Sequence, residues 1–233
     1  MTQSGQNPWV KTVATQDADG LLREVYDPQV ERLGAPTEFV QLASLLPELA
    51  HGRLQFYKMI DQLESGLTRI EKDAVIYVTS LLNQAPYCAS GACHKLEFDG
   101  ASAELIARLA GDPLADGTGS ARLDAIVRYT AILTRTPAAI TAADIDALRE
   151  AGLSDADIVV LNNLAAYFAY CNRITVGLGL LSPMPVAHVI GLDAARARLD
   201  AGQAAAGDGA GQGAAGDGAG QGVAAGAAAA QGA

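Results

Sequence analysis

The sequence predicts an all-α fold, and three observations support this prediction. Alanine and leucine, both strong helix formers, are among the most frequent residues of the chain. No run of β-branched residues alternates with polar residues as it would in a half-buried strand. Hydroxyl residues followed three positions later by an acid, a pattern that caps the start of a helix, occur at Thr68, Thr141 and Ser154. We therefore expect a bundle of helices.

Helix ends are marked along the chain by glycine and proline. Gly34, Gly111 and Gly152 follow apolar runs, as is typical of the residue after a helix. Pro86 suits the first turn of a helix, where its missing N–H is not needed. The apolar stretch Ile158–Leu181 is interrupted by polar residues and predicts a buried helix. In order, the expected helices cover 17–33, 36–45, 47–64, 69–83, 86–98, 102–111, 120–135, 141–151, 154–180 and 191–201.

The composition changes sharply near the C-terminus. Residues 202–233 consist almost wholly of glycine and alanine and contain the unit AAGDGAGQG twice in tandem. Such a unit lacks the large apolar residue that a calcium-binding β-helix needs in every repeat, so a flexible, disordered tail is expected. The sequence thus predicts an N-terminal arm over 1–16, a helical domain over 17–201 and a low-complexity tail over 202–233.

The charge balance excludes some classes of partner. The chain has 233 residues, of which 26 are acidic and 16 basic, giving a formal net charge of −10. Because its basic residues are scattered, we expect no nucleic-acid partner. The N-terminal residues lack the apolar core of a signal peptide, and we expect no membrane partner. We also expect neither a metal nor another cofactor. Three cysteines, an odd number, favour reduced thiols in the cytoplasm over a disulfide framework.

The segment Asn83–Phe98, NQAPYCASGACHKLEF, carries the candidate chemistry. If a helix begins near Pro86, Cys88 lies in its first turn, where free N–H groups and the helix dipole favour the thiolate. A thiolate attacks peroxides and disulfides. The alternative is that Cys88 is a small buried hydrophobic residue, a common role of free cysteine.

Two further candidates in this segment are Cys93 and His94. On an unbroken helix Cys93 is turned about 140° from Cys88, too far for a disulfide, and His94 also points away. A break at Ser90–Gly91 would let either residue turn toward Cys88, since glycine inside a helix costs about 1 kcal/mol relative to alanine. Zinc binding by the two cysteines and the histidine is disfavoured because a fourth ligand is missing.

Two acids in the expected helix 69–83 lie near its apolar face. Glu71 falls on the arc formed by the apolar residues, and Asp73 lies at its edge. Partial burial of either carboxylate would suit acid–base chemistry. The alternative is that both acids belong to the first helical turn, where carboxylates interact favourably with the dipole.

Two stretches of the chain resemble the carboxymuconolactone decarboxylase and alkylhydroperoxidase D-like superfamily, particularly its peroxidase-related branch. The first is Leu67–Cys88, LTRIEKDAVIYVTSLLNQAPYC, which is similar to the family's acid, aliphatic run and redox motif. The second is Tyr129–Leu180, which is similar to a helical hairpin that ends in an Asn-Arg pair, here Asn172 and Arg173. The resemblance extends over approximately Leu21–Leu181 and implies an alkylhydroperoxidase D-like helical bundle.

The resemblance also implies roles for individual residues. Without gaps, Asp73 takes the place of the family's proton-relay Glu and Cys88 that of the peroxide-reactive second cysteine. Ala85 and Ala92 stand where the family has its first cysteine and its histidine. A two-residue insertion near Ser90–Gly91 would instead place His94 at the histidine position, and Cys93 would be needed to resolve the oxidised thiol.

The function implied is a thiol-dependent, peroxidase-like oxidoreductase with a degenerate redox motif. Cys88 would attack a hydroperoxide, His94, Asp73 or Glu71 would manage the proton, and Cys93 or an external thiol reductant would resolve the product. One alternative is a non-redox, decarboxylase-like enzyme acting on an organic acid. The other is an inactive ligand-binding scaffold. The resemblance further implies a homo-oligomer.

Overall fold

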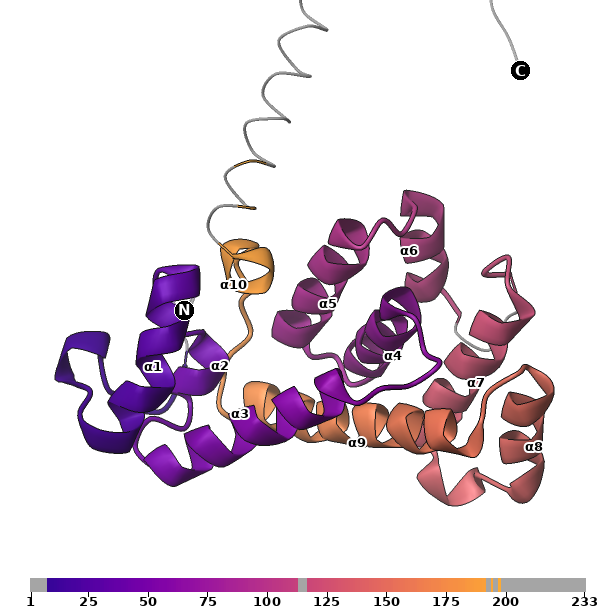
Figure 1. The fold of residues 1–233 in the computed structure, drawn as a ribbon, viewed down its shortest axis with the longest axis horizontal. Helices are drawn as coiled ribbons and strands as arrows, with labels where there is room; N and C mark the ends of the chain where they lie inside the picture. The colour runs from indigo at the N-terminus through magenta and orange to yellow at the C-terminus, as the bar shows by residue number, and fades with distance from the viewer. Residues whose placement is uncertain (1–7, 113–116, 192–193, 195–196, 198–233) are drawn as a thin grey trace, which may run out of the picture. The chain divides into compact units, whose positions relative to one another are not determined.

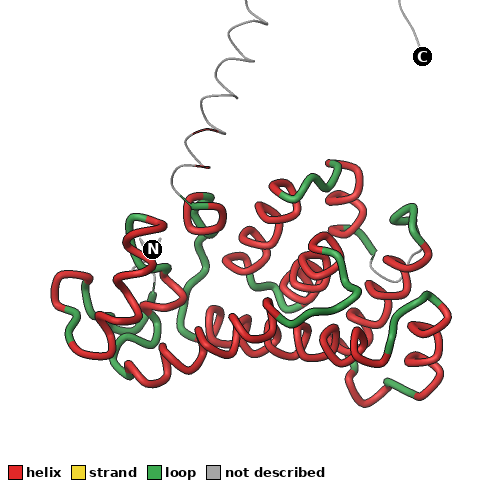
Figure 2. The backbone as a smooth tube through the Cα atoms, viewed as in Figure 1, coloured by secondary structure: helices red, strands yellow, loops and turns green. Residues whose placement is uncertain are grey.

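The computed structural model describes residues 8–112 and 117–191, together with Ala194 and Ala197. Every α-helix and 3₁₀ turn of these residues is shown in Figures 1 and 2, and none of the described segments forms a strand. The predicted all-α fold is therefore confirmed. The predicted tail, 202–233, lies outside the described residues, and so does most of the helix expected at 191–201, so the domain limits stay a prediction. The helices of residues 8–191 belong to one compact unit, which ends at Ala195.

Most helices begin and end within a few residues of the predicted bounds. The expected helix 36–45 is wrong in length, because the α-helix ends at Gln41. After it, backbone hydrogen bonds join residues three apart, and the Ser44 hydroxyl accepts the backbone N–H of Val13. Among the described residues, no helix is both long and apolar enough to cross a bilayer. The helices are α1 Gly20–Leu33, α2 Glu38–Gln41, α3 Pro47–Gln62, α4 Arg69–Leu82, α5 Pro86–Phe98, α6 Ala103–Ala110, α7 Ala121–Arg135, α8 Ala142–Glu150, α9 Asp155–Gly177 and the single turn α10 Ala187–Ile190.

The predicted caps account for the helix bounds. The Thr68 hydroxyl accepts the N–H of Glu71 at 3.1 Å, and the Glu71 carboxylate accepts the N–H of Thr68 at 2.7 Å, which starts α4. Ser154 and Asp157 start α9 in the same way. Gly34 has a φ of +82°, in the left-handed region that favours glycine, and ends α1 as predicted.

Helix α4 lies at the centre of the main hydrophobic core. It packs against α5, α7 and α9, and Figure 1 shows it between α5 and α7 and above α9. A second, smaller cluster of buried side chains joins α1, α2 and α3 and includes Leu22, Tyr26 and Val40. Because α4 and α5 form a hairpin in the main core, the start of α5 and its Cys88 are buried within it.

The described part of the predicted N-terminal arm packs against the end of α9. The backbone N–H of Trp9 donates to the backbone carbonyl of Leu178 at 2.9 Å. The indole ring covers Gly179, whose φ is +79° and where any Cβ would collide with the ring. Glycine at this position therefore permits both the turn after α9 and the close approach of Trp9.

Candidate active site

Cys88 lies in the first turn of α5, as the sequence predicted. Pro86 is the first residue of this helix, which places Cys88 among the backbone N–H groups that have no partner within the helix. The side chain is only 6% exposed, and its Sγ lies 3.8 Å from Oγ1 of Thr175 on α9. Burial raises the pKa of the Cys88 thiol above its usual range, and hydrogen bonds from Thr175 and Asn172 partly oppose that rise.

Asn172 connects this thiol to the α4–α5 hairpin. Its side-chain Nδ2 donates to Oγ of Ser80 at 3.0 Å, and its side-chain Oδ1 accepts from Nδ2 of Asn83 at 3.0 Å. The side chain is 1% exposed, so these bonds are made in an apolar surrounding and fix the amide orientation. The sulfur of Cys88 therefore faces two oriented polar groups of α9, and nothing in the spacing of the sequence indicated the contribution of Thr175.

Helix α5 continues without a break through Ser90 and Gly91, so the break considered in the sequence analysis is wrong. Glycine is needed at position 91 for another reason. A Cβ there would lie 2.9 Å from the sulfur of Met184, which packs against this face of α5. The Ser90 hydroxyl accepts the Met184 N–H at 2.8 Å and fixes the same segment. The glycine thus serves a tertiary contact.

Because α5 is unbroken, the structure does not bring Cys93 or His94 to Cys88. His94 Nδ1 lies 3.6 Å from a carboxylate oxygen of Glu97, too long for a hydrogen bond, and its side chain is 30% exposed. Cys93 Sγ lies 4.0 Å from the other Glu97 oxygen and interacts with Tyr77 of α4. The two residues face a different side of the helix, as predicted for the unbroken case.

Asp73 is buried between α4 and α5, with its side chain 5% exposed. Its carboxylate lies 3.7 Å from Nζ of Lys95, which in turn donates to the Tyr57 hydroxyl at 2.8 Å. Burial raises the pKa of Asp73 to about 7, although the Lys95 ammonium opposes the rise. A carboxyl with this pKa is suited to exchange protons at neutral pH. Lys95 and Tyr57 were missed in the sequence because they become neighbours only through helix packing.

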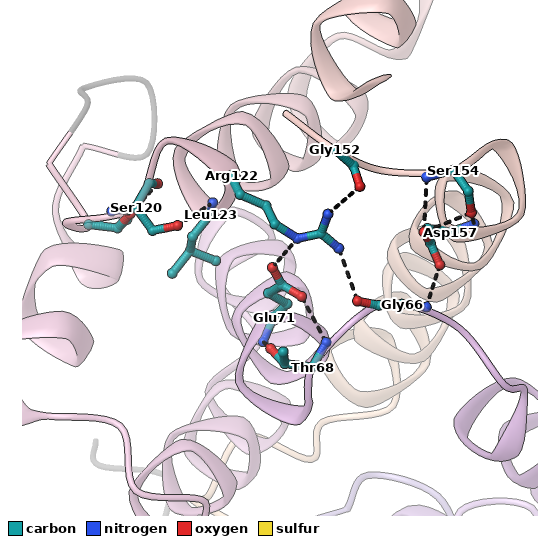
Figure 3. Close-up of polar contacts among 10 residues, drawn as sticks. Gly66, Thr68, Glu71, Ser120, Arg122, Leu123, Gly152, Ser154 and Asp157 are labelled. Carbon is teal, nitrogen blue, oxygen red and sulfur yellow. Dashed lines mark hydrogen bonds and ion pairs between the residues drawn. The ribbon is translucent and has the colours of Figure 1, made fainter. Parts of the chain in front are cut away.

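Glu71 has a structural position, at the end of α4 away from Ser80 and the Cys88 thiol. Besides capping α4, its carboxylate accepts from Nε of Arg122 on α7 at 2.7 Å. Arg122 also donates to the carbonyls of Gly152 and Gly66, at 2.7 and 3.0 Å (Figure 3). One guanidinium therefore joins α7, the α8–α9 turn and the segment before α4. The alternative interpretation of Glu71 as a first-turn acid is confirmed.

Cys171 was not among the candidates from the sequence, yet it lies near enough to Cys88 for the two thiols to interact electrostatically. It is on α9, one turn before Thr175, and is 3% exposed. Burial, together with proximity to the Cys88 sulfur, raises the pKa of the Cys171 thiol to about 12, against hydrogen bonding from Tyr167. In the described part of the chain none of the three cysteines forms a disulfide, and no three His, Cys, Asp or Glu side chains gather to hold a metal ion.

The fold is similar to several solved structures. An uncharacterized peroxidase-related protein from Ralstonia eutropha, described as an alkylhydroperoxidase AhpD core, is 19% identical with a TM-score of 0.68, over 76% of this chain and 92% of that one. A peroxidase-related protein from Silicibacter sp. is 24% identical with a TM-score of 0.64, over 76% and 93%. The debrominase Bmp8 is 18% identical with a TM-score of 0.62, over 75% and 91%.

Neither a family model nor a curated protein matches the sequence. At these identities the structural comparisons establish the architecture alone. The same architecture was expected from the resemblance of Leu67–Cys88 and Tyr129–Leu180, and it is now found by comparison of coordinates. The chain therefore has the fold of the alkylhydroperoxidase AhpD core.

Proposed function

We propose that this protein is a thiol-dependent, peroxidase-like oxidoreductase in which Cys88 reacts with a hydroperoxide. The observation that carries the proposal is the setting of the sulfur: the first turn of α5, with a hydrogen bond from Asn172 and a 3.8 Å contact to the Thr175 hydroxyl. Helix N–H groups and hydrogen-bond donors stabilise a thiolate once it forms. The peroxidase-related descriptions of two structural neighbours support the same chemistry.

The reaction begins with deprotonation of the Cys88 thiol, whose proton passes to water. The thiolate attacks the terminal oxygen of the hydroperoxide, the O–O bond breaks, and Cys88 becomes a sulfenic acid while an alkoxide leaves. We assign to Asp73 the supply of the proton that turns the alkoxide into an alcohol, through water, because its pKa of about 7 leaves it partly protonated at neutral pH. A thiol reductant of the cytoplasm returns two electrons and restores the thiol.

Replacement of Cys88 by serine is expected to abolish peroxide consumption, because a serine hydroxyl does not reduce peroxides. The measurement is consumption of hydrogen peroxide and cumene hydroperoxide with dithiothreitol as reductant. Cys93→Ser is the matched control, since Cys93 contacts Tyr77 and Glu97 and not Cys88. It should retain the parent rate. If Cys88→Ser consumes peroxide as fast as the parent, the proposal fails.

A second candidate function rests on a different observation, the cluster formed by the buried Asp73 with the half-buried Lys95 and Tyr57. A carboxyl near neutral pKa beside an ammonium is suited to bind and protonate an organic acid without redox chemistry. The debrominase among the structural neighbours supports the view that this fold hosts more than one reaction. Turnover of an organic acid by protein whose thiols have all been alkylated would favour this candidate over the peroxidase.

We also propose that the chain forms a homo-oligomer through the outer face of α3 and α9. This face exposes the apolar side chains of Leu49, Phe56, Met59, Val159 and Tyr170 and is hollowed by a groove of about 450 Å³. Light scattering after gel filtration is expected to give a multiple of the 23.9 kDa chain mass. Phe56→Glu should shift the protein toward the monomer, whereas a monomeric parent protein would contradict the proposal.

A further inference from the structure

The thiol nearest to Cys88 by helix geometry is Cys171. Residues four apart on a helix differ by about 40° in direction, so Cys171 and Thr175 lie on the same face of α9. Their Cβ atoms are then about 5–6 Å apart. Since Cys88 Sγ contacts Oγ1 of Thr175 at 3.8 Å, the Cys171 side chain occupies the adjoining position on the α5–α9 contact.

This position lies close to the distance limit of a disulfide. The axes of packed helices are about 8–10 Å apart, and each Cα lies about 2.3 Å from its axis. Facing Cα atoms at the contact are therefore roughly 4–5 Å apart. Because Cys171 is offset by about 5–6 Å along α9 from the residue that Cys88 contacts, the Cα atoms of the two cysteines are roughly 6–8 Å apart, close to the limit of about 7 Å for a disulfide. Both thiols are buried, at 6% and 3% exposure, so they share one water-poor compartment of the core.

The other thiol of the chain is excluded by the same geometry. Cys93 follows Cys88 by five residues on the unbroken helix α5 and is turned about 140° from it. Its sulfur interacts instead with Tyr77 and Glu97. Ala85, just before α5, offers no sulfur. A resolving partner within the chain must therefore come from α9.

We propose that Cys171 is the resolving cysteine of this protein, a role that rests on the proposed peroxidase function. The Cys171 sulfur attacks the sulfur of Cys88 sulfenic acid. The S–O bond breaks, the Cys171 proton passes to the departing hydroxide, and water leaves as the Cys88–Cys171 disulfide forms. An external dithiol then reduces this disulfide, giving its two electrons and two protons to regenerate both thiols. The redox pair of this chain thus bridges two helices that are distant in sequence.

The surroundings of Cys171 suit a buried partner that reacts only after Cys88. Tyr167 hydrogen-bonds the thiol, and Arg53 adds a positive charge nearby, and both favour the thiolate against the effect of burial. Arg53 is itself 6% exposed and is held by a bond to the Phe39 carbonyl at 2.8 Å, so its charge is fixed in place. The Cys171 sulfur is therefore held where it can act as a thiolate once Cys88 has been oxidised.

The test uses the full-length reduced protein in two parallel oxidations, with one equivalent of hydrogen peroxide and with diamide, followed by non-reducing peptide mass spectrometry. Diamide joins neighbouring thiols without any peroxidase activity. We expect a Cys88–Cys171 peptide and the loss of two thiols per chain in both arms. Cys171→Ala should instead accumulate a dimedone-reactive Cys88 and consume a single equivalent of peroxide, while Cys93→Ser should form the same disulfide as the parent.

The outcomes separate the inference from the proposed function. Oxidation of Cys88 by peroxide without a bond to Cys171 in either arm, or with a bond to Cys93, overturns the resolving role and leaves the peroxidase proposal intact. A Cys88–Cys171 bond with diamide but no reaction with peroxide overturns the peroxidase function and with it the resolving role. The parent protein alone decides between these results, so they do not depend on the folding of any variant.

Discussion

Replacement of Arg122 by leucine is expected to lower the free energy of unfolding by about 3 kcal/mol. The substitution leaves the Glu71 carboxylate, whose side chain is 9% exposed, without its cation, and a buried charge that loses its partner typically costs about 3–5 kcal/mol. It also removes the donors to the carbonyls of Gly66 and Gly152. For a domain of this size the midpoint of thermal unfolding should fall by roughly 6–12 °C, measurable by calorimetry.

The matched control is Arg149→Leu. Arg149 makes two short ion pairs, to Asp146 and Asp155 at 2.7 and 2.8 Å, but all three side chains are about half exposed or more. Exposed pairs contribute at most about 1 kcal/mol, so this variant should unfold close to the parent. The double variant Glu71→Gln, Arg122→Leu should recover part of the loss because no charge is left unpaired. Equal effects of Arg122→Leu and Arg149→Leu would show that the Arg122 cluster behaves as a surface pair.

Replacement of Asp73 by asparagine is expected to stabilise the protein increasingly as the pH rises from 5 to 8. Burial places the folded-state pKa of Asp73 at about 7, above its ordinary value of 3.8, so the folded state binds more protons than the unfolded state between these values. The stability contributed by this group therefore falls as pH rises and levels off above pH 7. Asparagine keeps the shape and carries no proton equilibrium.

The difference between parent and variant should change by on the order of 2–3 kcal/mol between pH 5 and pH 8, because each pKa unit corresponds to about 1.4 kcal/mol. Urea unfolding at several pH values measures it. Asp146→Asn, at an exposed position, is the control and should follow the parent at every pH. A difference that stays constant with pH would mean that the Asp73 carboxyl ionises as easily in the folded protein as in the unfolded chain.

The features that could be predicted from the sequence are those that depend on residues close together in the chain, such as the starts of helices. The caps at Thr68 and Ser154 and the proline at the start of α5 are local signals, and the first residues of the helices they begin were predicted within one residue. The motif resemblance placed Asp73 and Cys88 among the candidates, and both are buried in the core. Their burial could be predicted because both residues lie on the α4–α5 hairpin, whose helices follow from local signals in the sequence.

What the sequence did not predict depends on packing between distant segments. Thr175 and Cys171 become neighbours of Cys88 only when α9 docks on α5, and neither has a pattern of its own. Gly91 was misleading because the local cost of glycine in a helix suggested a break, whereas Met184 requires the space. No sequence pattern indicated a role for Lys95, because Asp73 and Tyr57 come close to its ammonium only when the helices pack.

The contact partners of Cys88 have a consequence for biosynthesis. Thr175 and Asn172 are both translated long after Cys88. A nascent chain that has emerged only through α5 presents this thiol without its later partners, and it remains in that state until the ribosome has added α9. Oxidants present during translation therefore meet a more accessible sulfur than the finished protein offers, which makes the nascent chain the stage most vulnerable to irreversible oxidation of this residue.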